Sequence, residues 1–413
     1  MHPSFTRPYA ITMWDFSWIE RRWPGAGYED WDQALEELAE RGYNAVRIDA
    51  FPHLVSADPQ RDWEILPVWT QTSWGAQSIV RITLMPALLE FIRAAQRHGV
   101  SVALSSWYRE DANNTRMAIR TPEDQARIWI DTLNHIAAAG LLDAIIYVDL
   151  CNEFPPGAPY LDTDELARAV SRAAPQNGNE LRNSITAQPT RKSERVSRWM
   201  RESIEIVRGA HPGLDYTYSF CDELTTWAQQ DVTALDVLEP HVWMATADGS
   251  DYNARVGYAF ERFDPVGFDN IVRNGRRVYE ADAERYDALL FATLDAVADW
   301  SRATGKGLYT TECWALVDYK DWPGLEWDWI KDLTAKGVRR AAATGRWVGI
   351  ATSNFCGPQF QGMWRDVEWH RELTGLIRSA PIDADLRVGR AGSPAVASGR
   401  SPQQGSLGKP LAT

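Results

Sequence analysis

The stretch that decides the fold is Ile145-Ile146-Tyr147-Val148-Asp149-Leu150-Cys151-Asn152-Glu153. It begins with an apolar, β-branched and aromatic run that is typical of a buried strand, and it ends in a carboxylate. A second stretch, Gly307-Leu308-Tyr309-Thr310-Thr311-Glu312-Cys313-Trp314, has the same plan. If both strands belong to one parallel barrel, Glu153 and Glu312 meet at its C-terminal mouth, where such barrels carry their reactive groups.

Outward from these stretches, short apolar runs alternate with longer amphipathic segments. We expect strands at residues 9–14, 44–49, 100–105, 143–150, 214–221, 235–242, 306–312 and 346–353. Between them, apolar residues recur at helical spacing, for example at Leu88, Ile92 and Ala95. Thr121-Pro122-Glu123-Asp124 has the composition of a helix start. Alternating strands and helices in this number predict a (β/α)8 TIM barrel of the α/β class.

Three connections in this pattern are long. They follow the second, fourth and sixth expected strands, at residues 50–82, 154–190 and 243–281. All three would rise from the C-terminal face, where long loops on a rigid scaffold carry specificity. From about residue 383 the periodicity lapses into a tail rich in Ser, Gly, Pro and Gln. We therefore divide the chain into a barrel, residues 1–382, and a disordered tail, residues 383–413.

Composition excludes several classes of protein. The 413 residues carry a net charge of −13 without a basic patch, so we expect no nucleic-acid partner. No apolar run approaches the ~20 residues that cross a membrane, so we expect no membrane partner. The N-terminus lacks the apolar segment of a secretory signal, and we expect a cytoplasmic protein. The oligomeric state is not indicated.

The sequence predicts neither a metal nor another cofactor. Its four Cys show no CxxC spacing, and we expect them to be buried, reduced thiols. Its seven His show no HxH or HExxH spacing. There is no GxSxG nucleophile elbow, and no glycine-rich phosphate loop follows a strand.

Two facing carboxylates suit glycosidic bond cleavage, in which one acts as acid/base and the other as nucleophile. The acid/base must be protonated near neutral pH, so its pKa must be raised, while the nucleophile must be ionised. A cation at Arg47 would favour an ionised Glu312. The alternative is that Glu153 and Glu312 merely form salt bridges at strand ends. Sequence alone does not separate a retaining from an inverting spacing.

Asn152-Glu153 at the end of the fourth strand and Glu312 at the end of the seventh resemble the signature of clan A glycoside hydrolases. The resemblance is to a divergent branch of the family 5 cellulase-like group, over roughly residues 9–380, and includes the Val46-Arg47-Ile48 strand. It implies a retaining hydrolase of β-linked oligosaccharides or glycosides, with carbohydrate as its partner. By resemblance, Glu153 is the acid/base, Glu312 the nucleophile, Asn152 the contact to the sugar 2-hydroxyl, Arg47 the partner of Glu312, and His241 the sixth-strand histidine.

The chain also departs from that pattern. Trp243 stands where the family usually has a tyrosine that touches the nucleophile. The eighth strand ends in Thr352-Ser353-Asn354-Phe355, where the family often has a tryptophan, and Trp364 comes only later. These departures motivate a second hypothesis, a cellulase-like barrel that binds sugar without cleaving it. Transglycosylation would use the same residues as hydrolysis.

Further contacts to a sugar are expected at other strand ends. Tryptophan is abundant, with 20 in the chain, and indole faces can stack on sugar rings or pack in a core. The residues expected to bind substrate, besides those already assigned, are Trp14, Trp107, Trp243, Trp314, Asp49, His53 and Asn354. Each has an alternative: core packing for the tryptophans, neutralisation of Arg47 by Asp49, loop packing for His53 and a turn for Asn354.

Overall fold

The structure is a computed structural model, and it describes residues 5–67, 73–161, 190–247, 249, 251–258, 265–317 and 319–387. Seven strands form one parallel sheet in the order β7-β6-β5-β2-β1-β11-β9. Their bounds are β1 (Tyr9–Asp15), β2 (Ala45–Asp49), β5 (Ser101–Ser105), β6 (Ile145–Asp149), β7 (Tyr216–Thr217), β9 (Leu308–Thr310) and β11 (Trp347–Ile350).

The gap between β7 and β9 is closed by residues 238–243. Parallel bridges join Phe220 to Pro240 and Leu238 to Leu308. Beyond them, β8 (Val242–Trp243) pairs in parallel with β10 (Cys313–Trp314). The chain thus has eight strand positions around the barrel, as the sequence predicts for a TIM barrel. We call each of these strand positions a stave.

The later strands are shorter than expected, because polar side chains replace part of the ladder. For instance, the amide of Ser219 donates to Oδ1 of Asp149 instead of to a strand carbonyl. A hairpin that was not expected, β3 (Asp62–Ile65) with β4 (Val80–Thr83), lies inside the first long connection. Its strands are too far apart in sequence for a short turn signal to reveal them.

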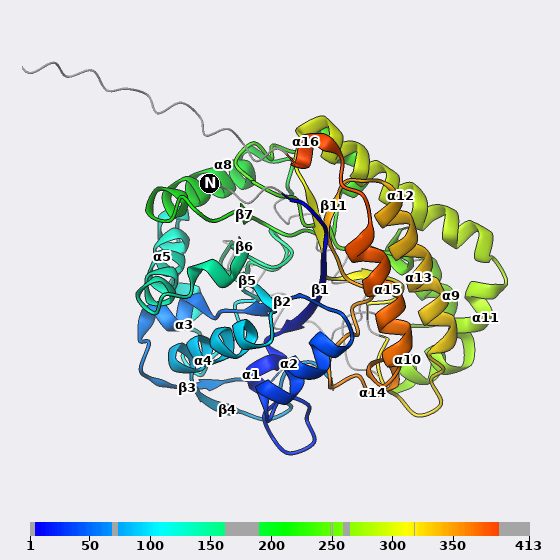
Figure 1. The fold of residues 1–413 in the computed structure, drawn as a ribbon, viewed down its shortest axis with the longest axis horizontal. Coiled ribbons are helices and arrows are strands. Elements are labelled where there is room, and N and C mark those ends of the chain that lie inside the picture. The colour runs from blue at the N-terminus through cyan, green and yellow to red at the C-terminus, as the bar shows by residue number, and fades with distance from the viewer. Residues whose placement is uncertain are drawn as a thin grey trace, which may run out of the picture.

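Helices surround the strands on the outside (Figure 1). The long ones are α2 (Trp31–Glu40), α4 (Leu84–Arg97), α5 (Pro122–Ala138), α8 (Glu194–Ala210), α12 (Ala283–Thr304), α13 (Asp328–Ala343) and α15 (Val367–Ser379). The predicted start of α5 is confirmed, because Thr121 Oγ1 accepts a hydrogen bond from the amide of Asp124 at 3.2 Å.

Short helices occupy the connections. They are α1 (Ser17–Glu20), α3 (Pro52–Ala57), α9 (Asp251–Val256), α10 (Pro265–Asn270), α11 (Arg276–Glu280), α14 (Gln361–Trp364) and α16 (Ala384–Arg387). A π-helical turn, η7 (Ile271–Gly275), joins α10 to α11. The 3-10 turns are η1 (Thr115–Ala118), η2 (Leu142–Ala144), η3 (Pro159–Leu161), η5 (Leu224–Gln229) and η6 (Met244–Thr246). Within the described residues, no helix is both long and apolar enough to cross a membrane.

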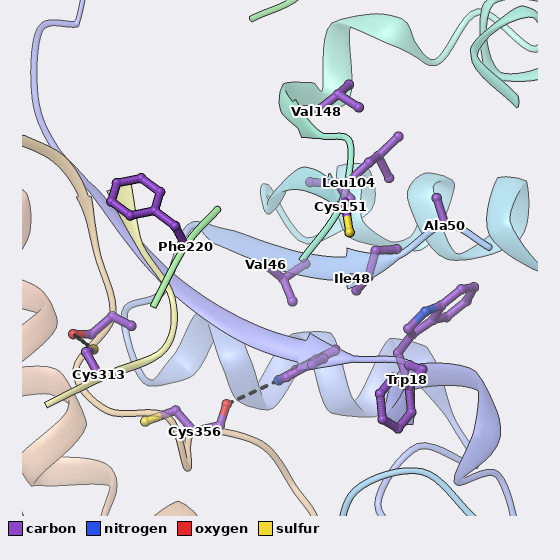
Figure 2. Packing of buried hydrophobic residues seen from close by; sticks show 14 of the residues in the cluster. Trp18, Val46, Ile48, Ala50, Leu104, Val148, Cys151, Phe220, Cys313 and Cys356 are labelled. Carbon is purple, nitrogen blue, oxygen red and sulfur yellow. Dashed lines mark hydrogen bonds between the residues drawn. The ribbon is translucent and has the colours of Figure 1, made fainter. Parts of the chain in front are cut away.

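The larger part of the core lies between the barrel and its helices. Alternate residues of each strand face outward, and Figure 2 shows four of them, Val46, Ile48, Leu104 and Val148. The thiols of Cys151, Cys313 and Cys356 are buried in the same cluster. Each fully buried aliphatic side chain stabilises the fold by about 1.5–3 kcal/mol relative to an exposed one.

A smaller cluster fills the lower end of the barrel interior. The inward-facing residues are Ile11, Ala45, Ala103, Tyr147, Val237, Tyr309 and Val348. Ile382 and Leu386, from the end of the described chain, complete this cluster, and Arg346 forms ion pairs with Asp383 and Asp385. Residues 388–413, most of the predicted tail, lie outside the described residues, and the division at residue 382 stays a prediction.

Candidate active site

The next inward layer of the barrel is polar and surrounds Arg47 on β2. The guanidinium is wholly buried, and Nη2 lies 2.5 Å from Asp149 Oδ2 and 2.7 Å from Asn152 Oδ1. Its Nε lies 3.3 Å from Glu239 Oε1. Although burial opposes the charge, Glu239 and Asp149 raise the pKa of Arg47. The layer therefore holds a permanent cation beneath the barrel mouth.

This cation reaches the nucleophile candidate. Nη1 of Arg47 lies 3.4 Å from Oε1 of Glu312, and it donates to Thr311 Oγ1 at 3.1 Å. The Glu312 side chain is 10% exposed. Arg47 thus fixes the orientation of Glu312 and favours its ionised form.

His241 lies between the two predicted catalytic glutamates. Its Nδ1 is 2.9 Å from Oε1 of Glu153 and 3.7 Å from Oε2 of Glu312. One oxygen of each carboxylate and one ring nitrogen all lie within 4.8 Å of one another. Two acids that are far apart in sequence are therefore brought face to face at the C-terminal ends of the strands.

The acids have similar pKa values but different surroundings. Burial raises the pKa of Glu312 to about 7, although His241 and Arg47 oppose the rise. Burial also raises the pKa of Glu153 to about 7, and the negative charge of Asp222 adds to the effect. Arg47 lowers the pKa of both acids, and its contact at 3.4 Å stabilises the carboxylate of Glu312 directly.

The histidine between them is neutral. Burial lowers the pKa of His241, against the attraction of Glu312. With its proton on Nδ1, the imidazole donates to Oε1 of Glu153. His241 therefore positions the acid/base candidate without adding a charge between the carboxylates.

A strained turn presents Glu153. Its φ is 51°, in the left-handed region, and its amide donates to Ser219 Oγ at 2.9 Å. The turn folds back so closely that a Cβ on Gly157 would lie 1.9 Å from the carbonyl oxygen of Asn152. A non-glycine residue held at positive φ costs about 1–3 kcal/mol and is typical of functional sites. No sequence pattern indicated this turn.

Two of the predicted substrate contacts also lie at the mouth. Oδ1 of Asn152 is held by Arg47, so its amide group is the part that it can offer to a hydroxyl. Trp107 is partly exposed, and its ring centre lies 4.7 Å from the guanidinium carbon of Arg47. Trp243 follows His241 by two residues and is buried at the end of β8.

Trp14 and Trp314 instead belong to the core. Trp14 donates to the carbonyl of Cys356 at 3.2 Å and packs against Tyr28 and Phe91. It alternates with the inward Met13, so it faces the helices. Trp314 donates to the carbonyl of Ala351 at 2.9 Å and packs against Trp347. Neither ring is exposed, so core packing is the correct alternative for both.

Asp49 and His53 support loops. The carboxylate of Asp49 accepts from the amides of Phe51 and Trp107 at 2.7 and 3.0 Å, so it neither neutralises Arg47 nor stands ready for a sugar. Nε2 of His53 lies 2.9 Å from the carbonyl of Arg109 in a buried position. The expectation that His53 lines the cleft is corrected, because its ring packs in the loop.

Asn354 is buried beside the loop that follows β10. Its Nδ2 donates to the carbonyl of Val317 at 3.4 Å, whereas Oδ1 has no hydrogen-bond partner in the structure. A buried acceptor without a partner costs free energy, and a sugar hydroxyl would satisfy it. Asn354 therefore stays a candidate for substrate binding.

Sequence reasoning missed the hydroxyl groups that support the acids. Ser105 and Ser219 accept hydrogen bonds from Arg47 at 3.0 and 3.1 Å, and both donate to Asp149. Each follows an inward-facing strand residue by two positions, so strand alternation could have found them. Asp222, which raises the pKa of Glu153, lies beyond a strand end and had no such signal.

The donor set Glu153, His241 and Glu312 is close enough to hold a metal ion. The guanidinium of Arg47, 3.4 Å from Glu312, already supplies a positive charge to the same carboxylate. A second cation would be repelled by it. The charges therefore suit a carboxylate pair better than a metal centre.

Comparison with known proteins places the chain in a family. A family model described as "Cellulase-like: Sugar-binding cellulase-like" matches residues 11–378. The structure of a "putative glycoside hydrolase" from Parabacteroides distasonis ATCC 8503 is 46% identical, with a TM-score of 0.83, and the match covers 92% of this chain and 96% of that one.

More distant solved structures share the fold alone. The beta-glycosidase BGL167 is 13% identical with a TM-score of 0.50, covering 92% of this chain and 98% of that one. A GH5_18 protein from Bifidobacterium longum subsp. infantis is 12% identical with a TM-score of 0.51, covering 91% and 81%. No curated protein matches the chain. The chain belongs to the cellulase-like family and has the TIM-barrel fold of clan A glycoside hydrolases.

Proposed function

We propose that this protein is a retaining glycoside hydrolase that cleaves β-linked oligosaccharides or glycosides, with Glu153 as acid/base and Glu312 as nucleophile. The observation that carries the proposal is the approach of the two carboxylates, whose nearest ligand atoms lie within 4.8 Å with His241 between them. Retaining enzymes hold these groups about 5–5.5 Å apart, and inverting enzymes about 6.5–9.5 Å apart.

The first step forms a covalent glycosyl-enzyme. An oxygen of ionised Glu312 attacks the anomeric carbon while protonated Glu153 gives its proton to the glycosidic oxygen. The bond from the anomeric carbon to the leaving group breaks, and an ester to Glu312 forms. Arg47 supports this step because it keeps Glu312 ionised and oriented until the attack.

The second step releases the sugar. Esterification removes the negative charge of Glu312, and because neighbouring carboxylates oppose each other's ionisation, the pKa of Glu153 should then fall. Glu153, now a carboxylate, takes a proton from water as the water oxygen attacks the anomeric carbon, and Glu312 leaves. A sugar hydroxyl in place of water would give transglycosylation with the same residues.

A second candidate function is sugar binding without cleavage. The description of the family as sugar-binding favours it, as does Trp243 in place of the usual tyrosine. Against it, a binding protein gains nothing from two close carboxylates that repel each other.

The test is a panel of aryl glycosides and oligosaccharides, run with the wild type and with Glu153→Gln and Glu312→Gln. Glu110→Gln is the matched control, since Glu110 is a half-exposed acid paired with Arg116 on the same face. We expect activity in the wild type and the control only. A 2-fluoro glycosyl fluoride should label Glu312, as peptide mass spectrometry would show. Sugar binding with neither turnover nor label would favour the second candidate.

A further inference from the structure

Among the described residues, side chains at the barrel mouth are more exposed around Glu153 than around Glu312, and we call these the open side and the closed side. The Glu153 side chain is 29% exposed, and Trp107 and Cys221 nearby are partly exposed. The Glu312 side chain is 10% exposed. Beyond it, Asn354 and Phe355, at the end of β11, are 1% and 0% exposed. Access to the carboxylates is therefore from the side of Glu153.

A buried lysine ties loops together on the closed side. The ammonium of Lys320 lies 5.3 Å from the ring centre of Trp74 and 5.0 Å from that of Phe268, and the side chain is wholly buried. The Trp74 ring also packs against Phe360, with centres 6.3 Å apart. We call Lys320, Trp74, Phe268 and Phe360 the Lys320 clamp.

The residues of the Lys320 clamp come from connections that follow different strands of the barrel. Trp74 belongs to the loop after β2, Phe268 to α10 in the connection after β8, and Phe360 to the loop after β11. In the barrel, β2 and β8 are separated by β1, β11 and the β9–β10 stave. The other way round the barrel, β5, β6 and β7 lie between them. Because Lys320 follows β10 and Phe360 follows β11, the contacts cross on the side of the stave that bears Glu312.

The loop that carries Trp74 is also anchored to α1. The amide of Gly75 donates to Ser17 Oγ at 2.8 Å, and its carbonyl accepts from Arg21 Nη1 at 3.0 Å. Gly75 has a φ of 59°, and a Cβ there would lie 2.6 Å from Glu20 Oε2. The wall formed by the clamp is thus fixed by packing and hydrogen bonds.

The chemistry of the proposed function assigns a sugar to each side. Glu153 protonates the leaving group, so the leaving group occupies the open side. The sugar whose anomeric carbon is attacked, with anything attached toward its non-reducing end, lies toward the closed side. We propose that the Lys320 clamp makes the pocket blind there, so that the enzyme removes terminal sugars from non-reducing ends. This inference rests on the proposed function.

A matched pair of substrates tests it. One is an aryl β-oligosaccharide that the enzyme hydrolyses, and the other carries a 4,6-O-benzylidene cap on its non-reducing sugar. We expect the wild type to release monosaccharide from the free chain, and to hydrolyse the capped chain at least about 100-fold more slowly. Equal hydrolysis of both, or release of internal fragments, would overturn the inference while the proposed function stands.

Variants of the clamp sharpen the test. Lys320→Ala and Trp74→Ala should raise the capped-to-free rate ratio by about 10-fold or more, because they remove contacts that close the wall. Lys336→Ala is the control, since its ammonium also lies near a ring, 5.6 Å from Tyr279, but on α13. Because the readout is a ratio within one variant, a loss of folded protein does not change it. An unchanged ratio in both folded clamp variants would contradict the clamp's role.

Two further outcomes distinguish a failure of the proposed function from a failure of the blind pocket alone. If neither substrate is hydrolysed and a 2-fluoro glycosyl fluoride leaves Glu312 unlabelled, the proposed function fails, and terminal action fails with it. If the capped fluoride labels Glu312 as fast as the uncapped one, only the blind pocket is wrong.

Discussion

Glu153 and Glu312 end staves on facing sides of the barrel mouth, yet their surroundings differ in charge and in exposure. Glu312 lies 3.4 Å from a buried cation and is almost covered, whereas Glu153 is 29% exposed and is influenced by the anion Asp222. Burial raises both pKa values to about 7, so burial does not distinguish them. The neighbouring charges do, and they support the opposite roles that we propose for the same chemical group.

The largest expected effect is on activity. Its dependence on the leaving group of the substrate distinguishes the two proposed roles. Glu312→Gln should lower kcat about 10⁴-fold or more on every substrate, because the covalent step is lost. Glu153→Gln should cost about 10²–10⁴-fold on poor leaving groups and far less on nitrophenyl glycosides, which need no proton. Steady-state kinetics across aryl glycosides of graded leaving-group pKa would measure this. The opposite pattern would exchange the two assignments.

The next largest effect is on stability and concerns Arg47, the cation that pairs with Glu312. Arg47→Met leaves Asp149, Glu239 and Glu312 buried without their counter-ion, which should cost about 3–5 kcal/mol of unfolding free energy. Urea denaturation would measure it. Arg339→Met, which breaks an exposed pair with Glu372, should change stability by less than about 1 kcal/mol. A small loss of unfolding free energy in Arg47→Met would mean that Arg47 does not stabilise the polar layer around it.

A smaller effect is on stability, because burial of Glu312 disfavours its ionised form. The pKa of Glu312 is about 7 in the folded protein and near 4.5 when unfolded, so its contribution to stability is lost as pH rises between these values. Glu312→Gln should therefore be more stable than the wild type by about 1–3 kcal/mol at pH 8, and the difference should vanish near pH 4. Thermal unfolding at both pH values checks it. A variant that is less stable at pH 8 would show that the pair with Arg47 outweighs desolvation.

The smallest effect is on the pH dependence of activity and concerns Glu153. Activity requires protonated Glu153, so it should fall as pH rises through about 7. Asp222→Asn removes a negative charge that raises this pKa, and the alkaline limb of kcat/KM should move to lower pH. Asp231→Asn, at a half-exposed acid paired with Arg201, is the control and should leave the profile unchanged. A move of the limb to higher pH would contradict the assignment of Glu153.

Sequence predicted the parts of the site that depend on strand order. Arg47 points inward from β2, and Asn152, Glu153, His241 and Glu312 lie at the ends of other staves, which a closed barrel brings together regardless of loop detail. The positions that sequence left open or misplaced depend on contacts between distant segments. Strand alternation explains Trp14, which faces the helices, once the inward neighbour Met13 is known.

Loops were less predictable for a physical reason. Asp49 and His53 are fixed by backbone groups of residues 107 and 109 on another connection, and no local pattern encodes such a contact. The Lys320 clamp joins four connections in the same way. The long connections were expected to carry specificity, but their pairing required the structure.

The pairing of β1 with β11 has a consequence for biosynthesis. Tyr9 lies beside Gly349, so the two strands that close the sheet at this seam are about 340 residues apart. At roughly 5–20 residues per second, a ribosome needs roughly 20–70 s to make the partner of β1. During that time the edge of β1 is unpaired and open to wrong partners. The nascent chain therefore keeps an unpaired strand edge until its last strand emerges.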